Sequence, residues 1–187
     1  MKKTNMALAL LAAVQGVIVF FALQHHTSLA DRAVEDTLLT FEQEQVDRIQ
    51  LEDADQHKIE LVKKDGSWHT PDDFSADTFR IERLLNTLNQ LKVGLPVSHK
   101  TSDQDRFAVA PDKFKGHILL SKGSESLAEL FIGNNTGARR SYVRKSDSPI
   151  IYTARIAEHD ATAKLADWWD KNALQLKSEE VQSVTLS

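Results

Sequence analysis

The hydrophobic pattern of this chain is strongest near its N-terminus. From Met6 to Leu23 the residues are almost all apolar, with no charged side chain and with Gln15 as the strongly polar exception. Built as a helix, these roughly 18 residues span about 27 Å, which matches the hydrocarbon core of a bilayer. We therefore predict a transmembrane helix over residues 6–23.

The charges around this run predict its orientation. Lys2 and Lys3 precede the run, and the next Lys or Arg along the chain is Arg32. Positive residues favour the cytoplasmic side, so residues 1–5 form a cytoplasmic tip and the rest of the chain is expected in the periplasm. The expected protein is single-pass, held in the inner membrane by a signal-anchor.

Two other interpretations of the run stay open. Small residues at Ser28 and Ala30 fit a signal-peptidase site, so cleavage after Ala30 is the main alternative, although the run is longer than a usual signal-peptide core. A buried helix of a soluble core is the other, and it fits less well because the run is apolar all round instead of striped.

Beyond a polar connector, residues 24–45, the pattern changes to that of a folded domain over residues 46–187. The second half of the connector, residues 31–46, is compatible with a short helix. Residues 46–51 and 57–64 alternate like two strands around the polar loop 52–56. The pair Asp65 and Gly66 favours a tight hairpin turn into a third strand that starts at Ser67.

An amphipathic helix is predicted next. Ser75 can cap it, Asp77 suits its first turn, and Phe74 and Phe79 have the spacing of a hydrophobic staple. Its apolar face has helical spacing and consists of Ile81, Leu84, Leu85, Leu88 and Leu91. Gly94 and then Pro96 end the helix.

The remaining pattern predicts two hairpins and one more helix. Residues 97–111 are irregular and polar; residues 116–133 and 141–154 each form a hairpin. A helix over 156–165 leads into Trp168 and Trp169, and residues 181–186 alternate like a last strand. Strands interrupted by two helices predict an α+β fold with a mainly antiparallel sheet.

Composition narrows the function classes. The formal charge is -4, so neither nucleic-acid binding nor an acidic tail is expected. The chain has no Cys, which excludes disulfides, thiol catalysis and Cys-ligated metal.

The order of elements and their turn residues resembles the bacterial family DUF 4340, a domain of unknown function. The positions that carry the resemblance, within residues 46–169, are Gly66, Trp68, Leu84 to Leu91, Phe107 to Val109, Ile132 to Gly137, Tyr142 to Arg144, Ile151 and Tyr152. The family often has Tyr-Gly-Leu where this chain has Phe107-Ala108-Val109. The resemblance implies an N-terminal membrane segment, a partner among ABC-transporter or other envelope proteins, and no transferable catalytic residue.

Candidate chemistry is sparse. The adjacent His25 and His26 lack a third ligand, and no His forms the i, i+4 pair with a Glu that zinc-protease helices use, so neither a metal nor a cofactor is expected. His159 and Asp160 could act as an acid–base couple, although they are predicted at the start of a surface helix. Residues 133–137 lack the Lys-Ser/Thr of a phosphate loop and are more typical of a turn.

One dense basic cluster, residues 139–145, offers a contact surface. In a strand, Arg140, Tyr142 and Arg144 share one face, which could bind an acidic partner, a glycan or lipid headgroups. The expected contact residues are these three and Trp169.

Three hypotheses follow. The first is a non-enzymatic, membrane-anchored accessory protein of the bacterial envelope, associated with an ABC-type complex. The second is a glycan- or lipid-binding module, and the third is a hydrolase. An exposed aromatic patch without a cavity favours the first, whereas a pocket with converging polar groups favours the second.

Overall fold

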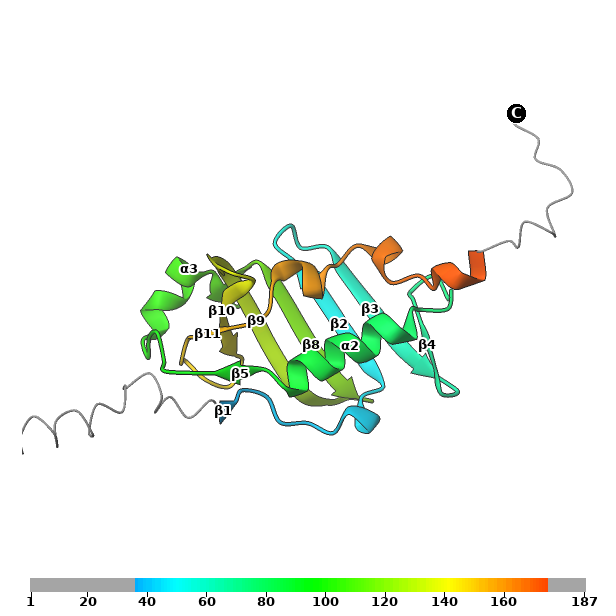
Figure 1. Ribbon diagram of the computed structural model, residues 1–187, viewed down its shortest axis with the longest axis horizontal. Helices are drawn as coiled ribbons and strands as arrows, with labels where there is room; N and C mark the ends of the chain where they lie inside the picture. Colours follow the sequence, from blue (N-terminus) through cyan, green and yellow to red (C-terminus); the bar gives the residue numbers. More distant parts are fainter. Residues whose placement is uncertain (1–35, 175–187) are drawn as a thin grey trace, which may run out of the picture. The chain divides into compact units, whose positions relative to one another are not determined.

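The structure of the protein, a computed structural model, describes residues 36–174 (Figure 1). The transmembrane helix predicted over 6–23, the cleavage site at Ala30 and the strand predicted over 181–186 lie outside these residues. Over the described part of the chain, no helix combines the length and apolar character that crossing a bilayer requires.

The described chain forms an α+β fold around a nine-stranded sheet, and every pairing in this sheet is antiparallel. The strand order is β1-β5-β11-β10-β9-β8-β2-β3-β4. The strands are β1 (Asp36–Thr37), β2 (Arg48–Asp53), β3 (Lys58–Lys64), β4 (Ser67–His69), β5 (Lys92–Val93), β8 (Gly116–Lys122), β9 (Glu125–Gly137), β10 (Arg140–Lys145) and β11 (Tyr152–Ala154). The antiparallel α+β prediction is confirmed, as are the predicted hairpins.

Period-two burial explains why these strands form. In β2, Ile49 and Leu51 are buried and Gln50 between them is exposed, so one side of the strand faces the core. The turn between β3 and β4 is built by Asp65 and Gly66, both with positive φ, which suits the twist of a tight hairpin.

Helix α2 (Thr78–Asn89) is the long helix of the described chain, and its capping differs from the prediction. Asp77 is the N-cap, and its carboxylate accepts a hydrogen bond from the backbone N–H of Arg80 at 3.0 Å. Ser75 instead bridges to His69 at the end of β4. The predicted staple is also wrong, because Phe74 and Phe79 are 62 % and 72 % exposed.

The helix predicted over 156–165 is replaced by two 3₁₀ turns, η3 (Glu158–Ala161) and η4 (Leu165–Asp167). Side chains compete with the helical backbone here: Asp160 accepts the Ala157 N–H at 2.9 Å, and the Thr162 hydroxyl donates to Asp167 at 3.1 Å. The spacing of small apolar residues was therefore compatible with turns as well as with a helix.

The helix predicted over 31–46 is also wrong in its described part. That segment contains β1 and the 3₁₀ turn η1 (Gln43–Gln45), and between them Leu39 and Phe41 are buried with a period of two. An extended chain buries both side chains, whereas a helix would separate them. Conversely, the segment predicted as irregular, residues 97–111, contains the 3₁₀ turn η2 (Thr101–Asp103), the short helix α3 (Gln104–Phe107) and the strand β6 (Val109–Ala110). Strand β6 pairs with β7 (Lys113–Phe114), which follows that segment, in a small second sheet.

Different elements cover the two faces of the large sheet. Helix α2 and the segment with η3 and η4 lie over one face (Figure 1), where Ile81, Leu88 and Trp168 pack into the main core. On the other face, β6 and β7 pack against β9, and Phe131 joins Val109 and Ile151 in a second, smaller core. The last 3₁₀ turn, η5, spans Lys171–Leu174.

Candidate functional site

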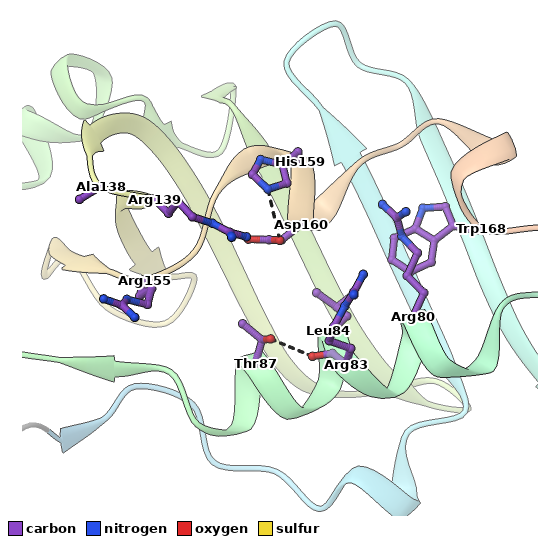
Figure 2. Close-up of a pocket in the computed structure, with 10 residues that line it drawn as sticks. All are labelled: Arg80, Arg83, Leu84, Thr87, Ala138, Arg139, Arg155, His159, Asp160 and Trp168. Carbon is purple, nitrogen blue, oxygen red and sulfur yellow. Dashed lines mark hydrogen bonds and ion pairs between the residues drawn. The ribbon is translucent and has the colours of Figure 1, made fainter.

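A cleft of about 740 Å³ opens between α2, the turn that joins β9 to β10, and the segment that follows β11 (Figure 2). Its lining residues are Arg80, Arg83, Leu84, Thr87, Ala138, Arg139, Arg155, His159, Asp160 and Trp168. We call this the arginine cleft.

Helix α2 supplies one wall of the arginine cleft. Arg80, Arg83 and Thr87 follow each other at spacings of three and four residues, so they share one side of the helix, next to the buried stripe that includes Leu84. The Thr87 hydroxyl donates to the backbone carbonyl of Arg83 at 2.8 Å (Figure 2). This wall therefore presents guanidinium groups, while its hydroxyl is already bonded.

Trp168 anchors the end of that wall. Its ring is fully buried, and its indole N–H donates to the carbonyl of Thr162 at 2.9 Å. The Arg80 guanidinium carbon lies 4.8 Å from the ring centroid of Trp168, which is cation–π distance. The rigid indole thus orients Arg80 and leaves its N–H groups available to a ligand.

The opposite wall comes from two loops. Arg139 lies in the β9–β10 turn, where Ala138 and Arg139 both have positive φ, 48° and 56°. Non-glycine residues in this left-handed region are uncommon and cost free energy, and they often occur at functional sites. Arg155 follows β11 and is exposed, and the 3₁₀ turn η3 then brings His159 and Asp160 into the lining.

The charge of the lining is unbalanced. Four guanidinium groups face one carboxylate, that of Asp160, in a chain whose formal charge is -4. Asp160 is itself occupied: one oxygen accepts the Ala157 N–H at 2.9 Å and the other lies 3.6 Å from Nε2 of His159. Within residues 36–174, none of the four arginines has a carboxylate oxygen within the 4.0 Å that defines an ion pair.

Such an arrangement can bind an anion. A guanidinium presents five N–H donors in a planar fork that matches phosphate and carboxylate oxygens, and its charge persists at any physiological pH. Several forks that converge on one concave space, without internal counter-ions, form a receptor for a group with more than one negative charge.

The contact residues expected from the sequence lie elsewhere. Arg140, Tyr142 and Arg144 do alternate on one side of β10, but α3 and β6 cover part of that side. Arg140 donates to the carbonyl and the hydroxyl of Thr153 at 3.2 and 3.3 Å, and the Tyr142 ring packs on Phe107 with centroids 4.4 Å apart. Nη2 of Arg140 and the ring of Tyr142 are therefore engaged within the domain.

Arg144 departs furthest from the expectation of an exposed contact residue, because it is only 3 % exposed. Its Nε donates to the carbonyl of Val109 at 2.8 Å, and its Nη1 donates to the carbonyls of Lys145, Ser146 and Ser148 at 2.8–3.2 Å. Burial lowers the pKa of the Arg144 guanidinium, and the charge of Glu129 opposes that shift. Arg144 therefore ties β6 to the end of β10.

Trp169 is half-buried, and its ring lies 6.2 Å from that of Phe74, edge to face. It bridges to Ala76 just before α2, so it lies close in the chain to the Trp168 end of the arginine cleft.

Two clusters outside the cleft contain titratable groups. His117 bonds Glu129 at 2.8 Å and stacks on Phe131 at 4.6 Å, which places it on the sheet face opposite α2. In the β2–β3 hairpin, Asp53 accepts the N–H groups of Asp55 and His57. Burial raises the pKa of Asp53, but its bonds to the side chain and backbone of His57 outweigh burial and lower it overall. That cluster stabilises a turn.

Sequence reasoning missed most of the arginine cleft. Arg80, Arg83 and Arg155 are separate in the sequence, and Arg139 was noticed only as part of the basic cluster. The available signal was the pair of arginines three residues apart on α2, beside the apolar stripe.

Comparison with known proteins gives a family and no function. One family model, described as a domain of unknown function (DUF4340), matches residues 68–187. Searches of curated proteins and of solved structures found no match.

Proposed function

The chain belongs to the DUF4340 family, and from the geometry of its cleft we propose that its domain is a non-catalytic module that binds an anionic ligand, one that carries phosphate or carboxylate groups. One observation carries the proposal: four arginines from three separate elements line a single cavity, and none is neutralised by a described carboxylate. An isolated cluster of like charges costs stability, and a bound anion would offset that cost.

The cavity favours ligand binding over a flat protein contact. A volume of about 740 Å³ lies within the range of small-molecule sites, roughly 300–1,000 Å³. Its charged residues line a hollow and not a flat face, which favours a ligand-binding module over a protein-contact surface.

The lining supports binding more than catalysis. Thr87, the hydroxyl-bearing side chain of the lining, donates to a backbone carbonyl, and Asp160 holds a backbone N–H. A nucleophile needs a base within hydrogen-bond reach, and a general base needs a free oxygen or nitrogen facing the substrate. His159 is exposed and its Nε2 lies 3.6 Å from Asp160, so hydrolysis with this pair as acid and base is the alternative that the experiment below must test.

We place this module at the bacterial envelope. The apolar run over residues 6–23 and the lysines before it support a single-pass anchor in the inner membrane, with the domain on the periplasmic side. The family resemblance supports an accessory role beside an ABC-type transport complex. Both parts of the proposal rest on sequence.

The test is calorimetric titration of inorganic pyrophosphate and of citrate into the full-length protein in non-ionic detergent. We expect one site, with affinity reduced at least tenfold in each of Arg83→Ala and Arg139→Ala, because each loses charge-assisted hydrogen bonds of about 1.5–3 kcal/mol. Arg106→Ala is the matched control, since Arg106 is exposed, pairs with Asp103 at 3.7 Å and lies outside the cleft. Equal affinity in all variants, or turnover of a phosphate ester that depends on His159, would contradict the proposal.

A further inference from the structure

Two exposed phenylalanines flank the N-terminal end of α2, beside the arginine cleft. Phe79 is 72 % exposed and Phe74 is 62 % exposed. The guanidinium carbon of Arg83, a cleft residue, lies 5.8 Å from the Phe79 ring centroid. Phe74 packs edge to face on Trp169, the neighbour of the cleft residue Trp168. The arginine cleft therefore has an aromatic rim, which we define as Phe74, Phe79 and Trp169.

Packing within the domain leaves the two phenylalanines of this rim exposed. Both phenylalanines keep most of their surface in water, and the stripe that α2 buries in the core consists of other residues. Apolar rings contiguous with unpaired guanidinium groups suit a ligand that is apolar at one end and anionic at the other.

The lining also discriminates between ligand classes. It contains no amide side chain, and its hydroxyl, that of Thr87, is bonded to a backbone carbonyl. One of the two carboxylate oxygens of Asp160 accepts the Ala157 N–H. Sugar hydroxyls need both donors and acceptors, so a neutral glycan would find few partners here. A phosphodiester only accepts, and four guanidinium groups only donate.

We propose that the arginine cleft binds the phosphate headgroups of anionic phospholipids, with the rings of Phe74 and Phe79 inserted into the lipid interface. This inference rests on the proposed function and names its ligand class. Basic residues near an anionic leaflet and aromatic residues at the headgroup level are the combination by which proteins bind membrane surfaces. Charge complementarity selects anionic headgroups, and the aromatic rim holds the domain against the membrane surface.

The absence of Cys from the chain makes a site-specific test simple. Thr78→Cys, exposed beside Phe79, carries an environment-sensitive fluorophore in the full-length protein, and Ser124→Cys in the exposed β8–β9 turn is the matched control. Each protein is placed in vesicles of phosphatidylcholine alone or of phosphatidylcholine with phosphatidylglycerol. An N-terminal anchor would insert into both vesicle types, so a dependence on phosphatidylglycerol isolates the cleft and its rim.

We expect the label at position 78 to shift to a nonpolar signal only with phosphatidylglycerol, and the label at position 124 to stay aqueous with both lipids. The double variant Arg83→Ala with Arg139→Ala should need a higher phosphatidylglycerol content for the same shift. Each arginine removed should weaken binding to these vesicles about fivefold. Phe74→Ser with Phe79→Ser should abolish the shift.

Three other outcomes would each contradict either the lipid inference or the proposed anion-binding function. A label at position 78 that stays aqueous while pyrophosphate still binds overturns the lipid inference and leaves the proposed anion-binding function in place. A label that shifts equally with both lipids also overturns it, because contact would then be independent of headgroup charge. Absence of pyrophosphate binding by the original protein would refute the proposed function.

Discussion

Arg144 and the arginines of the cleft are the same residue type in opposite environments. Arg144 is buried, and four backbone carbonyls accept its hydrogen bonds. Arg83, Arg139 and Arg155 are exposed, and no described carboxylate pairs with them. The difference shows that a guanidinium whose Nε and Nη1 donate to backbone carbonyls contributes to the fold, whereas one without such internal partners is available for binding.

One arginine of the cleft, Arg139, is also a close neighbour of Arg144 in the sequence. Arg139, Arg140 and Arg144 belong to one basic cluster, yet the fold sends Arg139 to the cleft and uses the other two within the domain. A register shift between Arg140 and Ser141 and a turn with positive φ at Arg139 separate them. Each prediction below perturbs one side of this comparison.

The largest expected effect follows from removal of the buried guanidinium. Arg144→Met leaves four carbonyls without their donor, so we expect the free energy of unfolding to fall by about 3 kcal/mol, the range seen when buried charged networks are broken. Urea denaturation measures this. Arg155→Met is the control and should change stability by less than about 0.5 kcal/mol. Equal losses of stability in the two variants would contradict the distinction between the buried arginine and the arginines of the cleft.

The next effect concerns the packing of α3 and β6 on the sheet, near the bonds by which Arg144 ties β6 to β10. Gly133 in β9 lies under the end of α3, and a methyl group at this position would fall on the carbonyl oxygen of Phe107 and 2.7 Å from Cγ1 of Val109. Gly133→Ala should therefore destabilise the protein by about 2 kcal/mol, as overpacking does. Gly123→Ala is the comparison for open space, although its positive φ adds strain of its own. A neutral Gly133→Ala, measured by urea denaturation, would mean that α3 is free to move off the sheet.

A smaller effect on stability is expected at the cleft. Arg83→Ala with Arg139→Ala removes two unpaired like charges, so the free energy of unfolding should change by no more than about 0.5 kcal/mol, with a gain at low salt. The same double variant should lose the thermal stabilisation that pyrophosphate gives the original protein. Thermal unfolding at two salt concentrations measures both. A large loss of stability without ligand would show that these arginines are structural, as Arg144 is.

The smallest effect concerns an exposed charge that is paired. The hydrogen bond from Lys64 to Asp73, at 2.6 Å, and its charge lower the pKa of the Asp73 carboxyl. Because the folded pKa lies below the unfolded value of about 3.9, this contribution is present above pH 4 and is lost as the pH falls through the folded pKa. Asp73→Asn should therefore be slightly less stable than the original at pH 6, and the difference should shrink as the pH falls below 4. A stability difference that grows as the pH falls would contradict the downward direction of the Asp73 pKa shift.

Much of the fold could be predicted from sequence, and little of the site. The hairpins follow from period-two burial, as in Ile49 and Leu51, and α2 follows from its apolar stripe. These are local patterns. Residues 156–165 were mispredicted because side-chain bonds of Asp160 and Thr162 replaced the helical ladder, which spacing alone does not reveal. The arginine cleft joins arginines up to 75 positions apart, from Arg80 to Arg155, so only the fold brings them together.

The most direct test of the contrast is to titrate inorganic pyrophosphate into the ¹⁵N-labelled full-length protein in non-ionic detergent and to follow each arginine Nε–Hε resonance, with chloride at matched ionic strength as the control. We predict that the resonances of Arg80, Arg83, Arg139 and Arg155 move in a saturable way while that of Arg144 stays in place. Uniform movement of all arginines, including Arg106, or movement at Arg144 and none in the cleft, would contradict the central claim that the unpaired arginines form the binding site.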